Sequence, residues 1–179
     1  MISFERMSIP DVVLITPDQH KDNRGVFSEV YIDHLNMPRW VQDNQSISYK
    51  AGTVRGLHYQ RGVYAQKKLV RCAWGSIVDV AVDIRPFSPT YGQHVSVILS
   101  AQNGKQLLVP DGFAHGFMTL LDNTVVVYKV DNLYNKESEG SIRWNDPSLN
   151  IYWQFPEISE ISEISEKDAA APLFKDIVL

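Results

Sequence analysis

Short runs of β-branched and aromatic residues recur along this chain, and they constrain its fold more than any other feature. Turn-forming pairs such as Asp111-Gly112 and Asp122-Asn123 separate them. Regular short strands with turn signals, and no alternation with helical segments, favour a sandwich or a barrel. We therefore predict an all-β fold. The runs are DVVLIT (11–16), GVFSEVY (25–31), SISYK (46–50), LVRCAW (69–74), SIVDVAVDI (76–84), GQHVSVILS (92–100), KQLLVP (105–110), GFMTLL (116–121) and TVVVYKV (124–130).

Length and charge limit the classes of protein to consider. The chain has 179 residues, which fits one domain spanning residues 1–179. The formal net charge of −4 argues against nucleic-acid binding, so an anionic ligand would need a local group of cations. Cys72 is the only cysteine, and its apolar neighbours predict a buried residue rather than a nucleophile. With no signal peptide or membrane-length apolar run, we expect a cytoplasmic protein.

Two polar features interrupt the apolar pattern. Asp79 and Asp83 lie within an apolar run and need partners if they point inward, for which Arg71 and Arg85 are the nearest candidates. Near the C-terminus, an isoleucine recurs every third residue in EISEISEISEKD (157–168), which on a helix gives a narrow apolar stripe. We interpret this segment as a short amphipathic element packed on the body, and expect another short helix near YIDHLNM (31–37).

The segment GKQLLVPDGFAHGF contains a spacing typical of one strand-turn-strand motif. Gly104, Pro110, Gly112 and His115 follow the pattern G-x5-P-x-G-x2-H, which resembles the second motif of the cupin superfamily. Proline and glycine suit the tight turn between the two strands. Metal-binding cupins place H-x-H and a glutamate on their first motif, whereas here Gln60 takes the second histidine's position after His58. Three good ligands cannot be assembled, so we expect a metal-free barrel.

A resemblance that runs almost end to end narrows the prediction further. The chain resembles the dTDP-4-dehydrorhamnose 3,5-epimerase family, which implies a cupin jelly-roll barrel with a few short helices and a metal-independent isomerase. The segments that carry the resemblance are DNRGVFSEVY (22–31), VQDNQS (41–46), RGLHYQRG (55–62), QKKLVRCAWGSIVDVAVDIR (66–85), SPTYGQHV (88–95), VPDGFAHGF (109–117), YKVDNLY (128–134), SEGSIRWNDP (138–147) and SEKDAAAPL (165–173).

The resemblance implies inversion of sugar carbons 3 and 5, on either side of a ketone at carbon 4. Each inversion needs a base, an acid on the opposite face and a cation near the enolate oxygen, but no cofactor. It makes His58 the base, with Asp168 orienting its ring, and Tyr128 the acid rather than Tyr134. It makes Lys68 the enolate-side cation, and strand alternation then sends Lys67 to the opposite face.

The resemblance also implies a substrate-binding set and a partner. The expected substrate is dTDP-4-keto-6-deoxy-D-glucose, the product dTDP-4-keto-L-rhamnose, and the assembly a homodimer with exchanged strands. The segment DVVLIT could add as an edge strand to a neighbour, and Arg24 and Glu29 are the residues that could complete the neighbour's pocket. The expected substrate-binding residues are Arg24, Glu29, Gln42, Asp43, Asn44, Arg55, His115, Tyr134, Glu139 and Lys167.

Several alternatives stay open from sequence alone. The same proton-transfer residues could serve an epimerase of carbon 3 or carbon 5 only, or one acting on another nucleotide-linked 4-keto sugar. A non-enzymatic cupin that binds sugar nucleotides is an alternative of a different class, although such a protein has no use for an acid and a base on opposite faces. A metal-dependent cupin enzyme is a further alternative.

Overall fold

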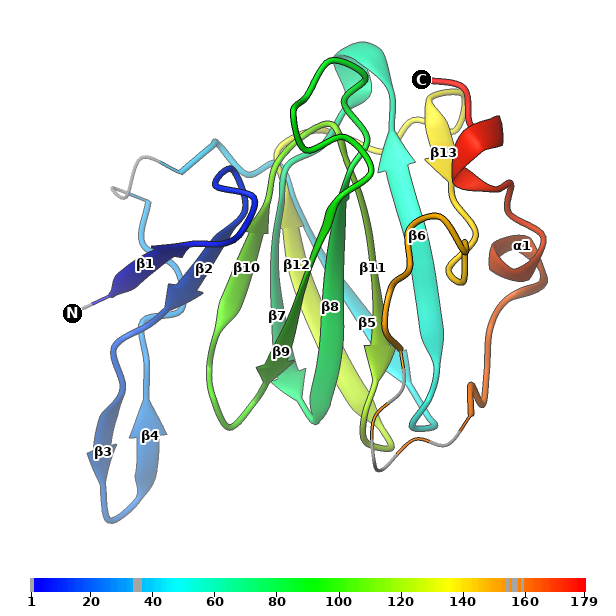
Figure 1. Cartoon of the computed structure of the whole chain (residues 1–179). Helices are drawn as coiled ribbons and strands as arrows, with labels where there is room; N and C mark the ends of the chain where they lie inside the picture. Colours follow the sequence, from blue (N-terminus) through cyan, green and yellow to red (C-terminus); the bar gives the residue numbers. More distant parts are fainter. Residues whose placement is uncertain (1, 34–36, 154, 156–157, 159) are drawn as a thin grey trace.

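The computed structural model describes residues 2–33, 37–153, 155, 158 and 160–179. Two antiparallel sheets face each other and form a cupin-like jelly roll, which confirms the expected all-β fold (Figure 1). The larger sheet has six strands. In spatial order they are β1 (Ser3–Arg6), β2 (Val13–Thr16), β10 (Gln106–Val109), β7 (Lys68–Trp74), β12 (Thr124–Val130) and β5 (Gln42–Ser48).

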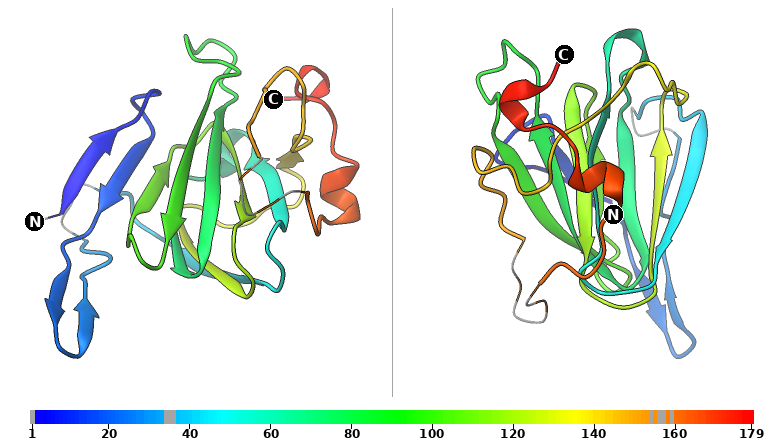
Figure 2. Two further views of the ribbon diagram at one scale, coloured as in Figure 1. Left: turned by 60° about the horizontal axis from the view of Figure 1, so that its bottom comes forward. Right: turned by 90° about the vertical axis from the view of Figure 1, so that its right-hand side faces the viewer.

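The second sheet has five strands, and a small hairpin stands apart from both sheets. The hairpin pairs β3 (His20–Asp22) with β4 (Gly25–Phe27) and projects away from the barrel (Figures 1 and 2). In spatial order the five strands are β13 (Glu139–Ser141), β6 (Val54–Gln60), β11 (Phe113–Thr119), β8 (Ser76–Asp83) and β9 (His94–Ser100).

The strand β8 is buried on both faces, which explains its imperfect alternation in the sequence. Ile77 and Ala81 point between the sheets, into a core that also contains Val70 of β7. Val78 and Val80 point to the outer face. There the C-terminal third of the chain covers the five-stranded sheet with a second apolar layer, as the right-hand view of Figure 2 shows. The members of this layer include Ile142, Leu149, Trp153 and Ile158.

The turn signals in the sequence fall at the ends of the strands as expected. Gly112 lies between β10 and β11 and has φ = +76°, a conformation that L side chains rarely adopt. A Cβ atom at this position would also meet Cγ of Arg85 at 2.6 Å. The Pro-Asp-Gly turn therefore needs glycine, both for its backbone and for the space beside Arg85.

The C-terminal repeat packs on the body of the protein, but it shows little of the helical structure that its apolar period would suit. Among the described residues of 158–169, only Glu166–Ala169 are helical (α1), and Glu163, which precedes them, forms an isolated parallel bridge with Thr53. The isoleucines still pack against the outer layer, as expected for an element docked on the body. Serine at every third position favours extended and turn conformations, because its side chain competes for backbone hydrogen bonds.

Other helical structure is limited to short pieces. The described residues also contain two 3-10 helices, Gly62–Tyr64 and Phe174–Asp176, and none of the helices found there is long and apolar enough to cross a membrane. The helix expected near 31–37 falls in part outside the described residues, and the described part of that segment is not helical.

Of the two buried aspartates on β8, only Asp83 has the expected arginine partner. Its carboxylate accepts hydrogen bonds from Arg85 Nε at 2.9 Å, Arg85 Nη2 at 2.7 Å and Thr90 Oγ1 at 2.6 Å. Burial acts to raise the pKa of Asp83, but these donors outweigh it and bring the pKa down to about 2. Asp79 does not pair with Arg71 or Arg85. Its partner is His115, which lies on the neighbouring strand.

We expect Asp83→Asn to lower the free energy of unfolding by about 3 kcal/mol, because Arg85 then loses its buried carboxylate partner. The folded-state pKa lies below the ordinary value of 3.8, so this contribution is complete above that pH and is lost as the pH falls through about 2. Urea denaturation of both proteins at neutral and acidic pH measures the difference. A variant as stable as the wild type at neutral pH would contradict the prediction.

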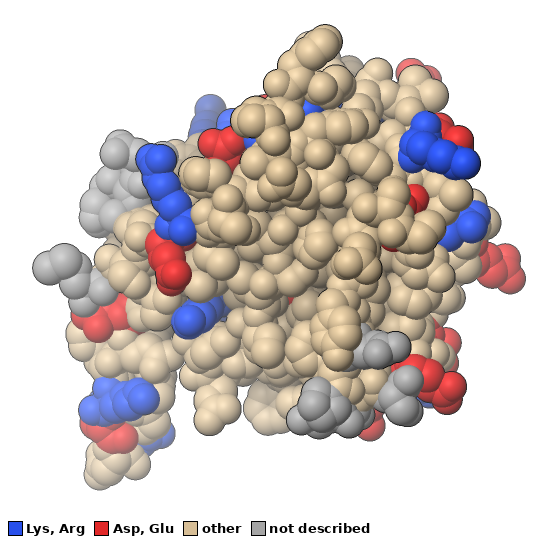
Figure 3. Space-filling view, in the orientation of Figure 1, with Lys and Arg blue, Asp and Glu red and all other residues tan. Residues whose placement is uncertain are grey.

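Charged side chains are scattered on the face seen in Figure 3. They lie in small groups of both signs toward the margins, and the centre of this face is uncharged. Cations that could hold an anionic ligand are therefore better sought in a cavity than on this surface.

Candidate active site

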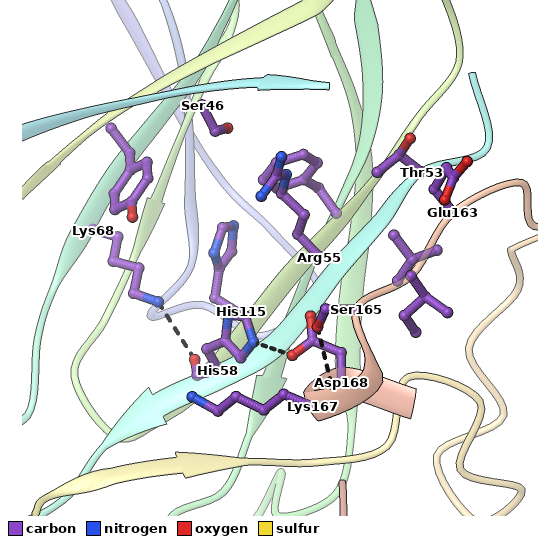
Figure 4. Close-up of a pocket in the computed structure, with 14 residues that line it drawn as sticks. Ser46, Thr53, Arg55, His58, Lys68, His115, Glu163, Ser165, Lys167 and Asp168 are labelled. Atoms are coloured by element: carbon purple, nitrogen blue, oxygen red, sulfur yellow. Dashed lines mark hydrogen bonds and ion pairs between the residues drawn. The ribbon is translucent and has the colours of Figure 1, made fainter. Parts of the chain in front are cut away.

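A cavity of about 540 Å³ lies at the mouth of the barrel, and side chains from both sheets line it (Figure 4). The five-stranded sheet contributes residues of β6 and β11, and the six-stranded sheet contributes residues of β5, β7 and β12. The segment around α1 closes one side. The lining residues are Ser46, Thr53, Val54, Arg55, His58, Lys68, His115, Phe117, Tyr128, Glu163, Ile164, Ser165, Lys167 and Asp168. All four residues predicted to be catalytic are among them.

His58 and Asp168 form a close pair on one wall of the cavity. His58 Nε2 lies 2.7 Å from Asp168 Oδ1, and Gly56 N–H donates to Asp168 Oδ2 at 3.1 Å. Ser165 caps α1 by accepting from the backbone N–H of Asp168, which fixes where the carboxylate points. Burial acts to raise the pKa of Asp168, but the hydrogen bond and charge of His58 outweigh it, so the pKa lies below its ordinary value.

Lys68 is the buried cation of the cavity. Its side chain points inward from the first residue of β7, and Nζ donates to the backbone carbonyl of His58 at 3.4 Å. Burial lowers the pKa of this ammonium to about 8, and the negative charge of Asp79 acts in the opposite direction. Lys67 lies on the other face and pairs with Asp111 at 3.3 Å, as strand alternation predicts.

Tyr128 belongs to the wall opposite His58. It lies on β12 of the six-stranded sheet, whereas His58 lies on β6 of the five-stranded sheet. Burial raises the pKa of the Tyr128 phenol, and the nearby guanidinium of Arg55 opposes this. The phenol is therefore neutral and carries a proton that it can give up toward the cavity. Tyr134 is 57% exposed outside the cavity, which agrees with the choice of Tyr128.

His115 lies directly beside His58, because the two residues pair across β11 and β6. The two strands approach closely here. A Cβ atom on Gly56 would meet Cα of Gly116 at 2.7 Å, and the register shifts between His115 and Phe117. Both histidines then face the cavity, with His115 between Lys68 and Arg55 in Figure 4.

The predicted binding residues divide into those that reach the cavity and those that do not. Arg55 lies at the mouth, where Nε donates to Ser48 Oγ at 3.1 Å. Lys167 also lines the cavity and pairs with Glu139 at 2.7 Å. Glu139 in turn accepts from the Tyr134 hydroxyl at 3.2 Å. Tyr134, Glu139 and Lys167 thus form one chain of contacts that ends at the cavity.

The three predicted residues of β5 lie outside this lining. Gln42 and Asn44 share one face of the strand, and their side-chain amides are hydrogen-bonded at 2.6 Å. Asp43 points to the opposite face, where it pairs with Lys129 at 2.8 Å. One strand therefore cannot direct all three side chains to a common ligand.

Arg24 and Glu29 lie outside the lining of this cavity in their own chain. Arg24 is at the tip of the β3–β4 hairpin and pairs with Asp22 at 2.6 Å, and Glu29 follows the hairpin in an exposed position. The hairpin projects from the side of the molecule where β1 and β2 lie, whereas β6, which carries His58, lies on the other side (Figure 1). Arg24, at the tip of the hairpin, therefore lies away from the cavity of its own chain.

Some residues at the site were missing from the sequence-based set. Asp79 supports His115 from behind, with Oδ1 2.9 Å from Nε2, although the buried aspartate was noted only for possible arginine partners. Ser165 is the helix cap, and its spacing in Ser-x-x-Asp is the signal that could have identified it. Thr53 and Glu163 carry no recognisable signal. Among the described residues, no group of three or more His, Cys, Asp or Glu side chains could hold a metal ion.

Comparison with known proteins identifies the family. A family model described as dTDP-4-dehydrorhamnose 3,5-epimerase matches residues 6–176. This chain belongs to that family. It is therefore an isomerase, as the sequence predicted.

Named relatives and solved structures of this epimerase family match the chain over nearly its full length. The Salmonella typhimurium enzyme is 49% identical over 185 residues, covering 100% of this chain and 99% of the relative. A Legionella pneumophila epimerase, solved with dTDP-4-keto-L-rhamnose, has a TM-score of 0.92 and 42% identity and covers 99% of this chain and 95% of its own. The Bacillus anthracis enzyme, solved with TDP and PPi, has a TM-score of 0.90 and 43% identity and covers 97% and 99%.

Proposed function

We propose that this protein converts dTDP-4-keto-6-deoxy-D-glucose to dTDP-4-keto-L-rhamnose by inverting carbons 3 and 5. The observation that carries the proposal is the His58–Asp168 pair, which faces a cavity that Lys68 and Tyr128 also line. This arrangement supplies a base, an acid on the opposite wall and a cation. Proton removal next to a ketone requires these three groups.

His58 is the proposed base. Its Nε2 atom faces Asp168, so Nδ1 is the ring nitrogen left for the substrate. A carboxylate at Nε2 favours the tautomer with the proton on that atom, and it stabilises the imidazolium that forms when Nδ1 takes a proton. His58 Nδ1 therefore removes the proton from the carbon next to the ketone.

Lys68 and Tyr128 complete each inversion. As the proton leaves, negative charge develops on the ketone oxygen, and a buried ammonium stabilises that charge more than an exposed one would. Tyr128 then gives its hydroxyl proton to the carbon from the wall opposite His58. Removal and return on opposite faces invert the carbon. We propose that Arg55 holds diphosphate oxygens at the mouth, where a planar guanidinium suits bidentate contact.

Product analysis tests this proposal directly. The protein would be incubated with dTDP-4-keto-6-deoxy-D-glucose, the mixture reduced with borohydride, and the released deoxysugars identified against standards of known configuration. We expect sugars of the L series, because inversion at carbon 5 changes the series. Recovery of D sugars alone from folded protein would overturn the assignment of inversion at both carbons.

The same assay predicts a pH dependence. Lys68 is active as the ammonium, and its pKa is lowered to about 8. We therefore expect kcat/KM to fall as the pH rises through about 8, approaching about tenfold per unit once this single proton is lost. Initial rates from about pH 6 to about pH 10 measure this limb. A rate that stays constant up to the ordinary lysine value of 10.5 would contradict the role of Lys68.

A homodimer would explain the position of Arg24 and Glu29. We propose that the β3–β4 hairpin of one subunit reaches the cavity of its partner, bringing both residues there. The hairpin carries Val26 and Phe27, which are 56% and 66% exposed and would be covered in such a contact. The strand expected to be exchanged, 11–16, has no free edge, because β2 lies between β1 and β10 of its own chain. At this end of the six-stranded sheet, the outer strand with an unpaired edge is β1.

Mixed dimers test the shared site. We would combine inactive His58→Asn subunits with Arg24→Ala subunits after sedimentation analysis of each. If hairpins are exchanged, one of the two sites in a mixed dimer contains both native residues, and activity returns on mixing. Monomers in sedimentation, or no recovery of activity from confirmed mixed dimers, would contradict the proposal.

We further propose that residues 1–179 act as one domain in the cytoplasm. The single unpaired Cys72 supports this, because disulfides are rare in that compartment.

A further inference from the structure

A second histidine–aspartate pair lies at the base of the same cavity. His115 Nε2 is 2.9 Å from Asp79 Oδ1, and both side chains are almost completely buried. Asp79 comes from β8 and His115 from β11, whereas the first pair joins β6 to α1. His115 and His58 are cross-strand neighbours, so the two pairs lie side by side at one ligand site.

The carboxylate of Asp79 is incompletely satisfied. Its side chain is 0% exposed, and Oδ2 has no hydrogen-bond partner among the described residues. A buried carboxylate in this state is costly unless a positive charge lies nearby. The Lys68 ammonium lies close to this pair, since its Nζ is 3.4 Å from the backbone carbonyl of His58, the cross-strand neighbour of His115. The negative charge of Asp79 opposes the effect of burial on that ammonium. Asp83, on the same strand, differs in having donors for both of its oxygens.

We propose that Asp79 is a positioning residue of the reaction, whose buried carboxylate fixes His115 and holds Lys68 in its charged form beside the substrate ketone. This inference rests on the proposed function for its catalytic meaning. The carboxylate holds the His115 proton on Nε2, which leaves Nδ1 as an acceptor facing the cavity. Lys68 then stays a cation in a place where burial alone would favour the neutral amine.

The other ionisable groups around Lys68 do not provide the same effect. From β6 come His58 and the Arg55 guanidinium, from β11 His115, and from β12 the neutral phenol of Tyr128. The Asp168 and Glu163 carboxylates also line the cavity, but His58 and Gly56 occupy the oxygens of Asp168, and Glu163 pairs with Lys50 at 2.6 Å. The remaining cation of the lining, Lys167, pairs with Glu139. Among the described residues around Lys68, Asp79 is therefore the carboxylate with a buried oxygen that has no hydrogen-bond partner, and its charge acts on the Lys68 ammonium.

The test compares Asp79→Asn, His115→Gln and Asp83→Asn with the wild type. Nitrogen-15 NMR of labelled lysines would follow the Lys68 ammonium with pH, its signal assigned as the one absent from Lys68→Met. We expect the Lys68 titration to move to lower pH in Asp79→Asn, and the basic limb of kcat/KM to move with it. His115→Gln, which keeps the carboxylate, should lower kcat and leave the limb near its wild-type position. Asp83→Asn should change stability alone.

Each result decides the proposal. An unchanged Lys68 titration in folded Asp79→Asn would overturn it, as would an equal shift in Asp83→Asn. If Asp79→Asn does not fold, carbon-13 NMR of the wild-type carboxyl decides, because a carboxyl that is protonated at neutral pH could not hold Lys68 charged. The NMR titrations need no turnover. A wild-type protein inactive on the nucleotide sugar would therefore refute the proposed function while leaving the role of Asp79 to be judged separately.

Discussion

His58→Asn is expected to lower kcat/KM by about a thousandfold or more, because it removes the base for both inversions. Asparagine keeps a polar side chain at this position, but it is shorter than histidine, does not reach Asp168 as Nε2 does, and cannot accept a proton from carbon at neutral pH. His58 is only part-buried, and its main partner is Asp168 at 2.7 Å, so the fold should tolerate the change. Steady-state rates with dTDP-4-keto-6-deoxy-D-glucose measure the loss.

Two comparisons make the His58 result interpretable. His94→Asn changes a half-buried histidine on β9 that does not line the cavity, and it should leave the rate unchanged. Calorimetry with dTDP should show that His58→Asn still binds the nucleotide. An active His58→Asn would mean that another group is the base. Loss of binding together with activity would favour the non-enzymatic alternative, in which His58 only holds the ligand.

Lys68→Met should lower kcat by about a hundredfold, with a smaller change in KM. The ammonium interacts with the substrate most strongly when charge develops on the ketone oxygen, so its removal affects the transition state more than binding. Methionine keeps the length and apolar surface of the chain. Because the change also removes the positive charge near the buried Asp79 carboxylate, we expect some loss of stability, so the rates are compared on folded protein.

The adjacent lysine provides the matched control for this substitution. Lys67→Met removes the same charge one residue away, on the face where Lys67 pairs with Asp111 and Asp131. We expect this variant to keep wild-type kcat and to unfold at a higher temperature than Lys68→Met, because the carboxylates paired with Lys67 stay partly exposed to water. Equal effects of the two substitutions would show that general charge, rather than the position of Lys68, accounts for the change.

The fold could be predicted from the sequence where local signals determine the structure, namely runs of β-branched residues and the turn-forming pairs between them. The nine runs of β-branched residues correspond to strands, and pairs such as Asn103-Gly104 mark their ends. Strand β6 was not among the runs, because Arg55, Gly56 and His58 interrupt its apolar pattern. Arg55 and His58 face the site rather than the core, so a strand that carries the chemistry gives a weak strand signal.

Predictions failed where contacts between residues far apart in the sequence determine the structure. The Ile-Ser-Glu repeat has a helical period, yet its described residues before Glu166 are not helical. Their isoleucines pack against the second apolar layer, and Glu163 forms a bridge with Thr53. Asp79 was expected to pair with an arginine, because nothing in a single sequence places β8 beside His115 of β11. Strand alternation correctly placed Lys67 and Lys68 on opposite faces of β7. The same rule places Asp43 on the opposite face of β5 from Gln42 and Asn44, but it was not applied when the family resemblance assigned all three to the ligand.

Solvent exchange tests the central claim most directly. The protein would be incubated in D2O with dTDP-4-keto-6-deoxy-D-glucose, and the sugar nucleotide analysed by mass spectrometry and NMR. If His58 and Tyr128 exchange protons at both carbons beside the ketone, the product contains two enzyme-dependent deuterium atoms, at carbons 3 and 5, and His58→Asn yields neither. Deuterium at one carbon alone would identify a single-carbon epimerase, and none from folded protein would contradict the proposed reaction on this substrate.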